Sequence, residues 1–298
     1  MNIYIKPLTI LLISTLFCHF FGQIKPIKEA NYPHYIVLDS LKNINREYSK
    51  INIYTLNAKE LYGVNKKIEV YNILSNDDLL LISALPDLVT NNDWIKVDIQ
   101  KIKNKILTKQ DIHKFLLSRY HNNTSDKKTL EYGLVKKMNN EYYVPKSTLI
   151  EYFYIKSYKF PLIPSYGTID ISSSKVTIKE MEKSYLEQMP EQGFPLNPKY
   201  MDISFAYPVY ARNYLSRTLD IKGEKSYQFW TLDNCRVADG PCVNQGIDRF
   251  IYIPKKGIVG GSYDFYFTNI PRSSQLITSA RLWDNIINER IMIAEELK

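Results

Sequence analysis

The pattern of apolar and polar positions predicts a mixture of helices and strands along this chain. The strongest pattern lies in residues 273–297, where apolar side chains recur every three or four positions and predict one long C-terminal helix. Those side chains are Leu276, Ala280, Trp283, Ile287, Ile291 and Ala294.

Capping residues predict further helices. Thr177 and Glu180 have the spacing of a capping box, which predicts a helix that runs to about Gln188. The segment 75–78 (SNDD) has a similar start and precedes the apolar run 79–84, so we expect a short helix that ends before Pro86. Helices are also expected after Thr108 and over 209–217.

Short apolar or alternating runs between turn residues predict strands. They lie at 35–38, 51–54, 68–71, 132–135, 141–144, 226–232, 249–253 and 263–267. The runs 132–135 and 141–144 flank the segment 137–140 (KMNN) and predict a hairpin. Because helices and strands do not alternate as regular βαβ units, the sequence predicts an α+β fold with mixed helices and antiparallel strands.

The N-terminus has the pattern of an export signal. Lys6 is the only charge before an almost unbroken apolar run over 8–21, and the small residue Gly22 follows it. The run is shorter than the about 20 residues that a membrane-spanning helix needs. We therefore expect residues 1–22 to be a signal peptide and the protein to be periplasmic or secreted. Two alternatives stay open: lipid anchoring at Cys18 and retention of the apolar segment as an anchor.

Residues 23–298 are long enough for one large domain or two of ordinary size. Pro161, Pro164 and Gly167 predict a boundary near residue 160. We expect an N-terminal α+β region over 23–160 and a C-terminal α+β region over 161–298. With 45% hydrophobic and 23% charged residues, the composition is that of a globular protein and excludes a disordered chain.

The net charge of +8 is concentrated in one stretch. Residues 96–159 contain 14 Lys and Arg against 6 Asp and Glu, whereas the rest of the chain is balanced. This surplus predicts either a basic surface for an anionic partner or an ordinary solvated lysine face. An exported chain does not meet genomic DNA, so no nucleic-acid partner is expected.

Two cysteines remain after the signal peptide, Cys235 and Cys242. They bracket a loop that contains the turn-forming residues Asp239, Gly240 and Pro241. In an oxidising compartment an even pair at this spacing predicts a disulfide that closes a hairpin loop. A catalytic or metal-binding thiol is the alternative.

Several classes of chemistry lack their sequence signals. The chain contains no GxxxxGK[ST] or GxGxxG loop, no HExxH or CxxC pair and no GxSxG elbow. We therefore expect no cofactor and no metal.

These absences favour a non-enzymatic role in a bacterial envelope, in binding or assembly, with a glycan or a protein as partner. Tyr142, Tyr143 and Trp230 are the candidate ligand-binding residues, because exposed aromatic rings stack on sugars. The alternative is a secreted hydrolase of glycan or peptide that uses paired carboxylates such as Asp202 and Asp264. A third possibility is a structural subunit whose C-terminal helix docks on a partner.

Overall fold

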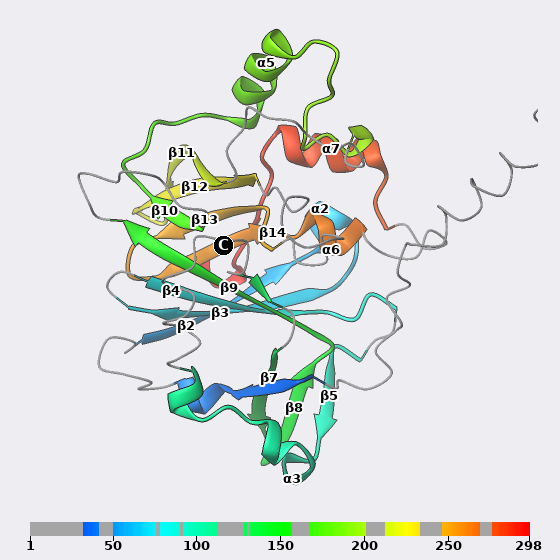
Figure 1. Ribbon diagram of the computed structural model, residues 1–298, viewed down its shortest axis with the longest axis vertical. Coiled ribbons are helices and arrows are strands. Elements are labelled where there is room, and N and C mark those ends of the chain that lie inside the picture. The colour runs from blue at the N-terminus through cyan, green and yellow to red at the C-terminus, as the bar shows by residue number, and fades with distance from the viewer. Residues whose placement is uncertain are drawn as a thin grey trace, which may run out of the picture.

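The computed structural model describes residues 32–41, 50–75, 78–89, 92–112, 128–129, 132–156, 167–200, 212–232, 246–268 and 276–298. The fold is mostly β-sheet with short helices, which corrects the expected α+β fold of mixed helices and strands with a long C-terminal helix. Its three sheets are stacked as layers (Figure 1).

The central layer is a six-stranded sheet in the order β10-β9-β4-β3-β2, with β6 paired to β9. Its strands are β2 (Lys50–Asn57), β3 (Lys67–Leu74), β4 (Asp78–Leu85), β6 (Lys128–Thr129), β9 (Ser147–Lys156) and β10 (Thr168–Asp170). Successive residues of a strand point to opposite faces. The run Leu79–Ile82 therefore supplies Leu79 and Leu81 to one neighbouring layer and Leu80 and Ile82 to the other, and all four are fully buried.

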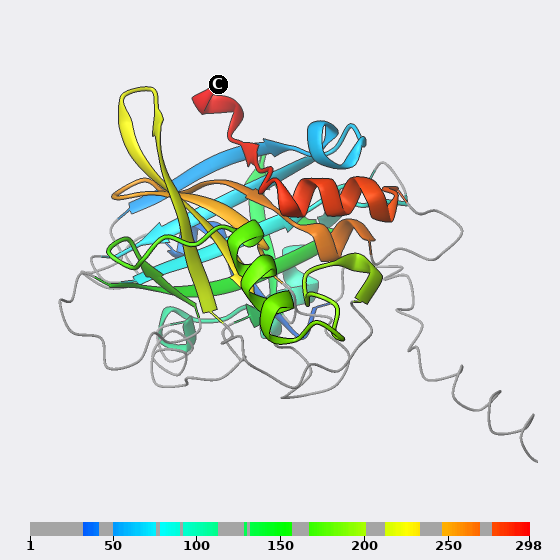
Figure 2. The same ribbon diagram turned by 90° about the horizontal axis from the view of Figure 1, so that it is seen from above.

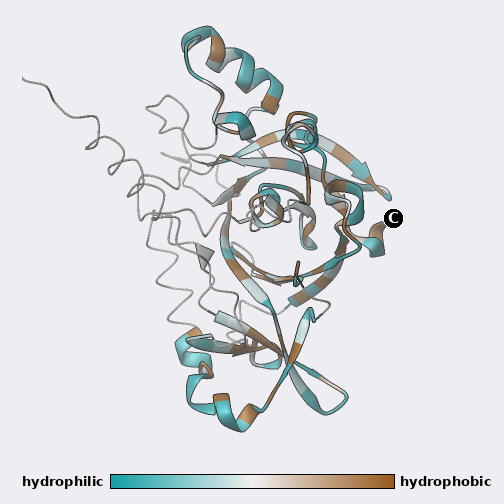
Figure 3. Cartoon of the chain, turned by 90° about the vertical axis from the view of Figure 1, so that its right-hand side faces the viewer, coloured by the Kyte–Doolittle hydropathy of each residue, from teal (hydrophilic) through white to brown (hydrophobic). Residues whose placement is uncertain are grey.

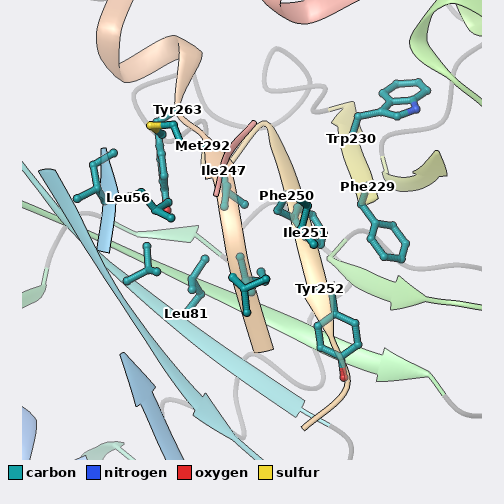
Figure 4. Packing of buried hydrophobic residues seen from close by; sticks show 14 of the residues in the cluster. Leu56, Leu81, Phe229, Trp230, Ile247, Phe250, Ile251, Tyr252, Tyr263 and Met292 are labelled. Carbon is teal, nitrogen blue, oxygen red and sulfur yellow. The ribbon is translucent and has the colours of Figure 1, made fainter. Parts of the chain in front are cut away.

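A five-stranded antiparallel sheet covers one face of the central sheet. Its strands, in spatial order, are β11 (Arg212–Ile221), β12 (Glu224–Leu232), β13 (Arg249–Ile253), β14 (Gly257–Ser262) and β15 (Met292–Ile293). Figure 4 shows Leu56 and Leu81 of the central sheet in the same core as Phe250 of β13. Asn72 also fastens the two sheets, because its side chain accepts a hydrogen bond from Ile258 N at 2.7 Å and donates one to Ile258 O at 2.9 Å.

A four-stranded sheet lies against the other face of the central sheet and is called the small sheet below. Its order is β1 (His34–Val37), β7 (Tyr132–Met138), β8 (Glu141–Pro145) and β5 (Trp94–Val97). Leu134 and Ile36 pack with Tyr71 and Ile82 of the central sheet. The opposite face of the small sheet is covered by α3 (Ile99–Ile102) and η3 (Lys103–Lys105), with Ile99 of α3 packed on its core. The turn η2 (Leu38–Leu41) follows β1, and its Leu38 and Leu41 pack in the core that the small sheet shares with the central sheet.

Short helices cover the ends and the outer face of the two large sheets. Three lie at one end, at the right of Figure 1 and towards the viewer in Figure 3: α2 (Lys59–Tyr62), α6 (Asp264–Thr268) and α7 (Ser279–Ile287). The Tyr62 ring stacks on Phe267 there, with centroids 4.0 Å apart. The longest described helix, α5 (Ile178–Gln188), and the turn η5 (Pro198–Tyr200) lie outside the five-stranded sheet (Figure 2).

The expected long C-terminal helix was wrong. The segment forms α7, then β15, then the turn η7 (Glu295–Leu297). Helix α7 ends at Asn288 because Glu289 adopts a left-handed conformation (φ 51°) and buries its carboxylate, which accepts hydrogen bonds from Ile178 N at 2.6 Å and from the Ser216 hydroxyl. The following apolar residues then pair with Gly260 and Gly261 of β14 as a strand, although their spacing suits a helix.

Three shorter predictions were also wrong. Residues 79–84 belong to strand β4, and the polar start that resembled a cap is the turn between β3 and β4, where Asp78 N donates to Ser75 Oγ at 2.8 Å. A short apolar run buried on both faces cannot be told from a buried helix by periodicity. The expected helix over 209–217 is strand β11 in its described part, and the expected strand over 263–267 is helix α6.

Other local predictions are confirmed. Helix α5 begins with the Thr177–Glu180 capping box. The hairpin of β7 and β8 turns at Asn139 and Asn140, both at positive φ.

The main core draws on residues from both 23–160 and 161–298, so the two regions share one hydrophobic interior.

Buried tyrosines predict a loss of stability at alkaline pH. Burial raises the pKa of Tyr32 and of Tyr252 to about 12 each. A phenol whose pKa is higher in the folded state stabilises the fold fully below its unfolded pKa of about 10, and this contribution is lost as the pH rises towards 12. We expect the urea concentration at the midpoint of unfolding to decrease as the pH is raised from about 10 to about 12. The decrease should be smaller in the double variant Tyr32→Phe and Tyr252→Phe. An identical decline in that variant would contradict this assignment.

Candidate functional site

The residues expected to form a ligand site lie in three separate places. Asp202, Cys235 and Cys242 fall outside the described residues. Trp230 of β12 is 1% exposed, its ring stacks on Tyr214, and its indole Nε1 donates to Val176 O at 2.8 Å. The structure therefore places Trp230 in the core of the five-stranded sheet and away from Tyr142 and Tyr143 in β8.

Tyr142 and Tyr143 are themselves separated, because neighbouring residues of a strand point to opposite faces. Tyr142 lies on the outer face of the small sheet and packs on the core beneath α3. Tyr143 lies on the inner face, the one turned towards the central sheet. Both rings are partly exposed, but they do not form one platform.

Charged and aromatic side chains gather on the face of the small sheet that carries Tyr143. In the small sheet Lys96, Tyr143 and Lys136 lie directly opposite one another on adjacent strands β5, β8 and β7. Trp94 is two residues before Lys96 and so shares its face. Lys136 Nζ lies 4.9 Å from the centre of the Trp94 ring, within the range of a cation–π interaction.

Two carboxylates from different sheets hold these side chains. Glu141 accepts hydrogen bonds from Lys96 Nζ and, at 2.9 Å, from the Tyr143 hydroxyl. Glu69 of β3 accepts from Lys136 Nζ at 2.7 Å and from the Tyr71 hydroxyl. We call this surface the junction face, defined by Glu69, Trp94, Lys96, Lys136, Glu141 and Tyr143.

A small pocket of about 70 Å³ opens next to the junction face. It is lined by the ends of β3 and β4, by Trp94 and by Pro145, with Lys67, Glu69 and Asp93 as its charged groups. Asp93 is paired with Lys66 at 2.8 Å. Its volume is well below that of pockets that enclose a drug-sized ligand, which is about 300–1,000 Å³. The pocket can therefore hold one protruding group of a ligand that lies across the face.

Hydrogen bonds tune the ionisable groups of the junction face. The hydrogen bond from Lys96 lowers the pKa of the Glu141 carboxyl, and the same bond raises the pKa of the Lys96 ammonium. The hydrogen bond from the Tyr143 hydroxyl to Glu141 raises the pKa of Tyr143. These shifts favour the Glu141 carboxylate, the Lys96 ammonium and the neutral phenol of Tyr143 at neutral pH.

This arrangement suits binding of a polyhydroxylated ligand. Aromatic rings with a polar rim can stack on the C–H face of a sugar, and carboxylates and ammonium groups supply acceptors and donors for hydroxyl groups. Sequence reasoning found Tyr143 but missed Trp94, Lys136 and Glu69. The alternation of apolar and polar residues in 94–97 and the turn at 139–140 could have indicated part of this site, since together they align β5, β8 and β7. The contact between Lys136 and Glu69 depends on how two sheets pack and has no local sequence pattern.

Asp264, a candidate carboxylate of the hydrolase alternative, lies in a buried ion pair. Its side chain is bound by the Arg249 guanidinium, with Nη2 at 3.0 Å from Oδ1, and it accepts from the Tyr62 hydroxyl at 2.8 Å. Asp264 is 3% exposed and Arg249 is 2% exposed. This geometry explains Asp264 as a buried structural group at the start of α6.

Two features are absent from the described residues. No group of three or more His, Cys, Asp or Glu side chains converges there as a metal site would require. None of the helices in this part of the chain is long and apolar enough to cross a membrane.

Comparison with known proteins adds no relative to this description. No protein family, no curated protein and no solved structure matches the chain.

Proposed function

We propose that this chain is an exported bacterial envelope protein with a non-enzymatic binding role, and that its junction face binds a glycan. The observation that carries the proposal is the placement of Trp94 and Tyr143 on one partly exposed face, between two lysines and two carboxylates. The pocket beside Trp94 would receive one substituent of the sugar.

Two buried carboxylates, Asp264 and Glu289, have structural partners, which favours binding over catalysis by these groups. Asp264 is neutralised by Arg249, and the buried Glu289 is occupied by Ile178 N, the Ser216 hydroxyl and Arg217, whose Nη2 lies 3.5 Å from Glu289 Oε2. A hydrolase of the paired-carboxylate type needs two accessible carboxyl groups on either side of a bond. Glu69 and Glu141 are accessible, but each is held by a lysine and a tyrosine.

Export is the second part of the proposal and rests on the sequence. We propose that residues 1–22 are removed and that Cys235 and Cys242 form a disulfide in the periplasm or outside the cell. Closing such a short loop should stabilise the fold by about 2.5 kcal/mol. Intact-mass measurement of the protein from the periplasm or medium should show a start near Gln23 and a mass two hydrogens below that of the reduced form. A full-length, reduced protein in the cytoplasm would contradict both expectations. A lipid adduct on Cys18 would contradict the start near Gln23 and would show a lipid-anchored protein.

Ligand-induced thermal stabilisation tests the binding proposal. We would screen the processed protein against peptidoglycan fragments and against neutral and acidic oligosaccharides. A ligand at a hundred times its dissociation constant adds about 2.7 kcal/mol, which raises the melting temperature by several degrees in a chain of this size.

The variant Trp94→Ala should remove the shift given by any active oligosaccharide, because it deletes the ring beside the pocket. Trp283→Ala is the matched control, since Trp283 is a partly buried tryptophan that packs against the main core and lies in α7, at the far side of the molecule. No shift with any sugar, or an equal shift in both variants, would refute glycan binding at this face.

A further inference from the structure

The outer face of the small sheet carries a second surface, distinct from the junction face. Exposed lysines follow one another along α3, η3 and the next turn, and one more lies on β7. We call this set the outer basic surface, defined by Lys101, Lys103, Lys105, Lys109 and Lys137. In Figure 1 it lies at the lower end of the molecule, where α3 projects beyond the small sheet.

The placement of the lysines follows from the fold of this segment. Asp98 caps α3 by accepting a hydrogen bond from Gln100 N at 2.9 Å, which fixes the direction of the helix over the sheet. Ile99, Ile102 and Ile106 turn inward and pack on Val135 and Val144. The lysines between them are consequently directed to solvent, so the apolar pattern of the segment produces a cationic outer layer.

The surface keeps a positive charge after its acidic neighbours are considered. Asp98 and Asp111 are the acidic side chains of the same segment, 98–111, and both bind backbone N–H groups: Asp98 that of Gln100, and Asp111 that of Thr108 at 3.1 Å. Lys137 Nζ lies 5.9 Å from the centre of the Tyr142 ring. Segment 98–111 and Lys137 together hold five lysines against two carboxylates, and this excess of positive charge among the described residues attracts anions.

Partly exposed aliphatic groups lie among the lysines. Ile99, Ile102 and Ile106 pack inward but each keeps some exposed surface. Lysine stems can extend along apolar surface while their ammonium groups remain in water, which is the arrangement found where a protein rests on a membrane. A soluble acidic polysaccharide would satisfy the lysines but would leave these aliphatic groups in water.

We propose that the outer basic surface docks the protein on an anionic lipid headgroup surface. Juxtaposed lysines gain about 1 kcal/mol each near an anionic leaflet, about a fivefold gain in binding per lysine. The attraction is screened by salt, whereas the aliphatic contribution is not. Docking through this end would leave the junction face, on the other side of the small sheet, free to bind its ligand.

Co-sedimentation of the processed protein with vesicles tests the proposal. Vesicles of phosphatidylcholine alone would be compared with vesicles that contain 30% phosphatidylglycerol, a composition about that of an anionic membrane, at low and high salt. We expect binding to the anionic vesicles only, and a steep decrease at high salt. The triple variant Lys101→Gln, Lys103→Gln and Lys105→Gln should bind about 100-fold more weakly, from three fivefold losses.

The matched control is the triple variant Lys179→Gln, Lys183→Gln and Lys225→Gln, which removes the same charge from exposed lysines on α5 and β12. It should bind nearly as well as the unmodified protein. Equal losses in the two triple variants, or no binding to anionic vesicles, would overturn the proposal. Tight binding to a soluble acidic polysaccharide with no binding to vesicles would also overturn it and would assign the surface to a glycan.

Discussion

Replacing Trp230 by Ala should lower the free energy of unfolding by about 3–5 kcal/mol, the range for large aromatic truncations in a packed core. The indole is 1% exposed and lies 4.3 Å, centroid to centroid, from the Tyr214 ring at an interplanar angle of 12°. Truncation would leave a cavity beside Tyr214 and would remove the donor to Val176 O. Val176 N in turn donates to Leu215 O, so the segment that leads into α5 would lose one of its attachments to the sheet.

Trp94→Ala is the control variant, because it truncates the same type of side chain at a partly exposed position. We expect it to cost less than half as much, because a partly exposed side chain buries less apolar area. Urea unfolding of both variants measures the difference. At a temperature where both remain folded, the Trp230 variant should keep its affinity for glycan and the Trp94 variant should lose it. The reverse pattern would restore Trp230 to the binding site.

Replacing Asp264 by Ala should also cost about 3–5 kcal/mol, because it leaves the Arg249 guanidinium buried without its carboxylate. Arg249 would keep the hydrogen bond from its Nε to Arg290 O at 3.1 Å but would lose the carboxylate that its Nη1 and Nη2 bind, and the Tyr62 hydroxyl would lose an acceptor. A buried uncompensated charge is among the most destabilising changes that a single substitution makes.

Asp284→Ala is the control for this substitution. Asp284 pairs with Arg290 at 2.9 Å, but both side chains are about half exposed, and such surface pairs contribute at most about 1 kcal/mol. Chemical denaturation of the two variants should therefore separate them clearly. If Asp264→Ala kept full stability and abolished an observed hydrolysis, the structural assignment of Asp264 would be wrong and the hydrolase alternative would gain support.

The sequence predicted local structure well where capping or turn residues favour one backbone conformation. The Thr177–Glu180 box fixes the start of α5, and the paired asparagines 139 and 140 fix a hairpin turn. The prediction failed for a strand that is buried on both faces, because such a strand does not alternate between apolar and polar residues. Leu79–Ile82 is apolar throughout because the central sheet is sandwiched between two others, and nothing in the run itself states that.

The C-terminal segment failed for a different reason. Its apolar spacing continues past residue 288, but the buried carboxylate of Glu289 binds Ile178 N and Ser216, residues more than 70 positions away. A long-range polar contact of this kind ends the helix, and local periodicity does not contain it. The same limit applies to the candidate site, since Glu69 reaches Lys136 only through the packing of the small sheet on the central sheet.

The most direct test of glycan binding at the junction face is the affinity of two neighbouring tyrosine variants for the oligosaccharide that gives the largest thermal shift. Tyr143→Ala removes a ring from the junction face, whereas Tyr142→Ala removes the same ring from the opposite face of the same strand. Titration calorimetry should show a loss of about tenfold or more for Tyr143→Ala, equivalent to about 1.4 kcal/mol, and an unchanged affinity for Tyr142→Ala. Equal affinities, or a loss confined to Tyr142→Ala, would contradict the account.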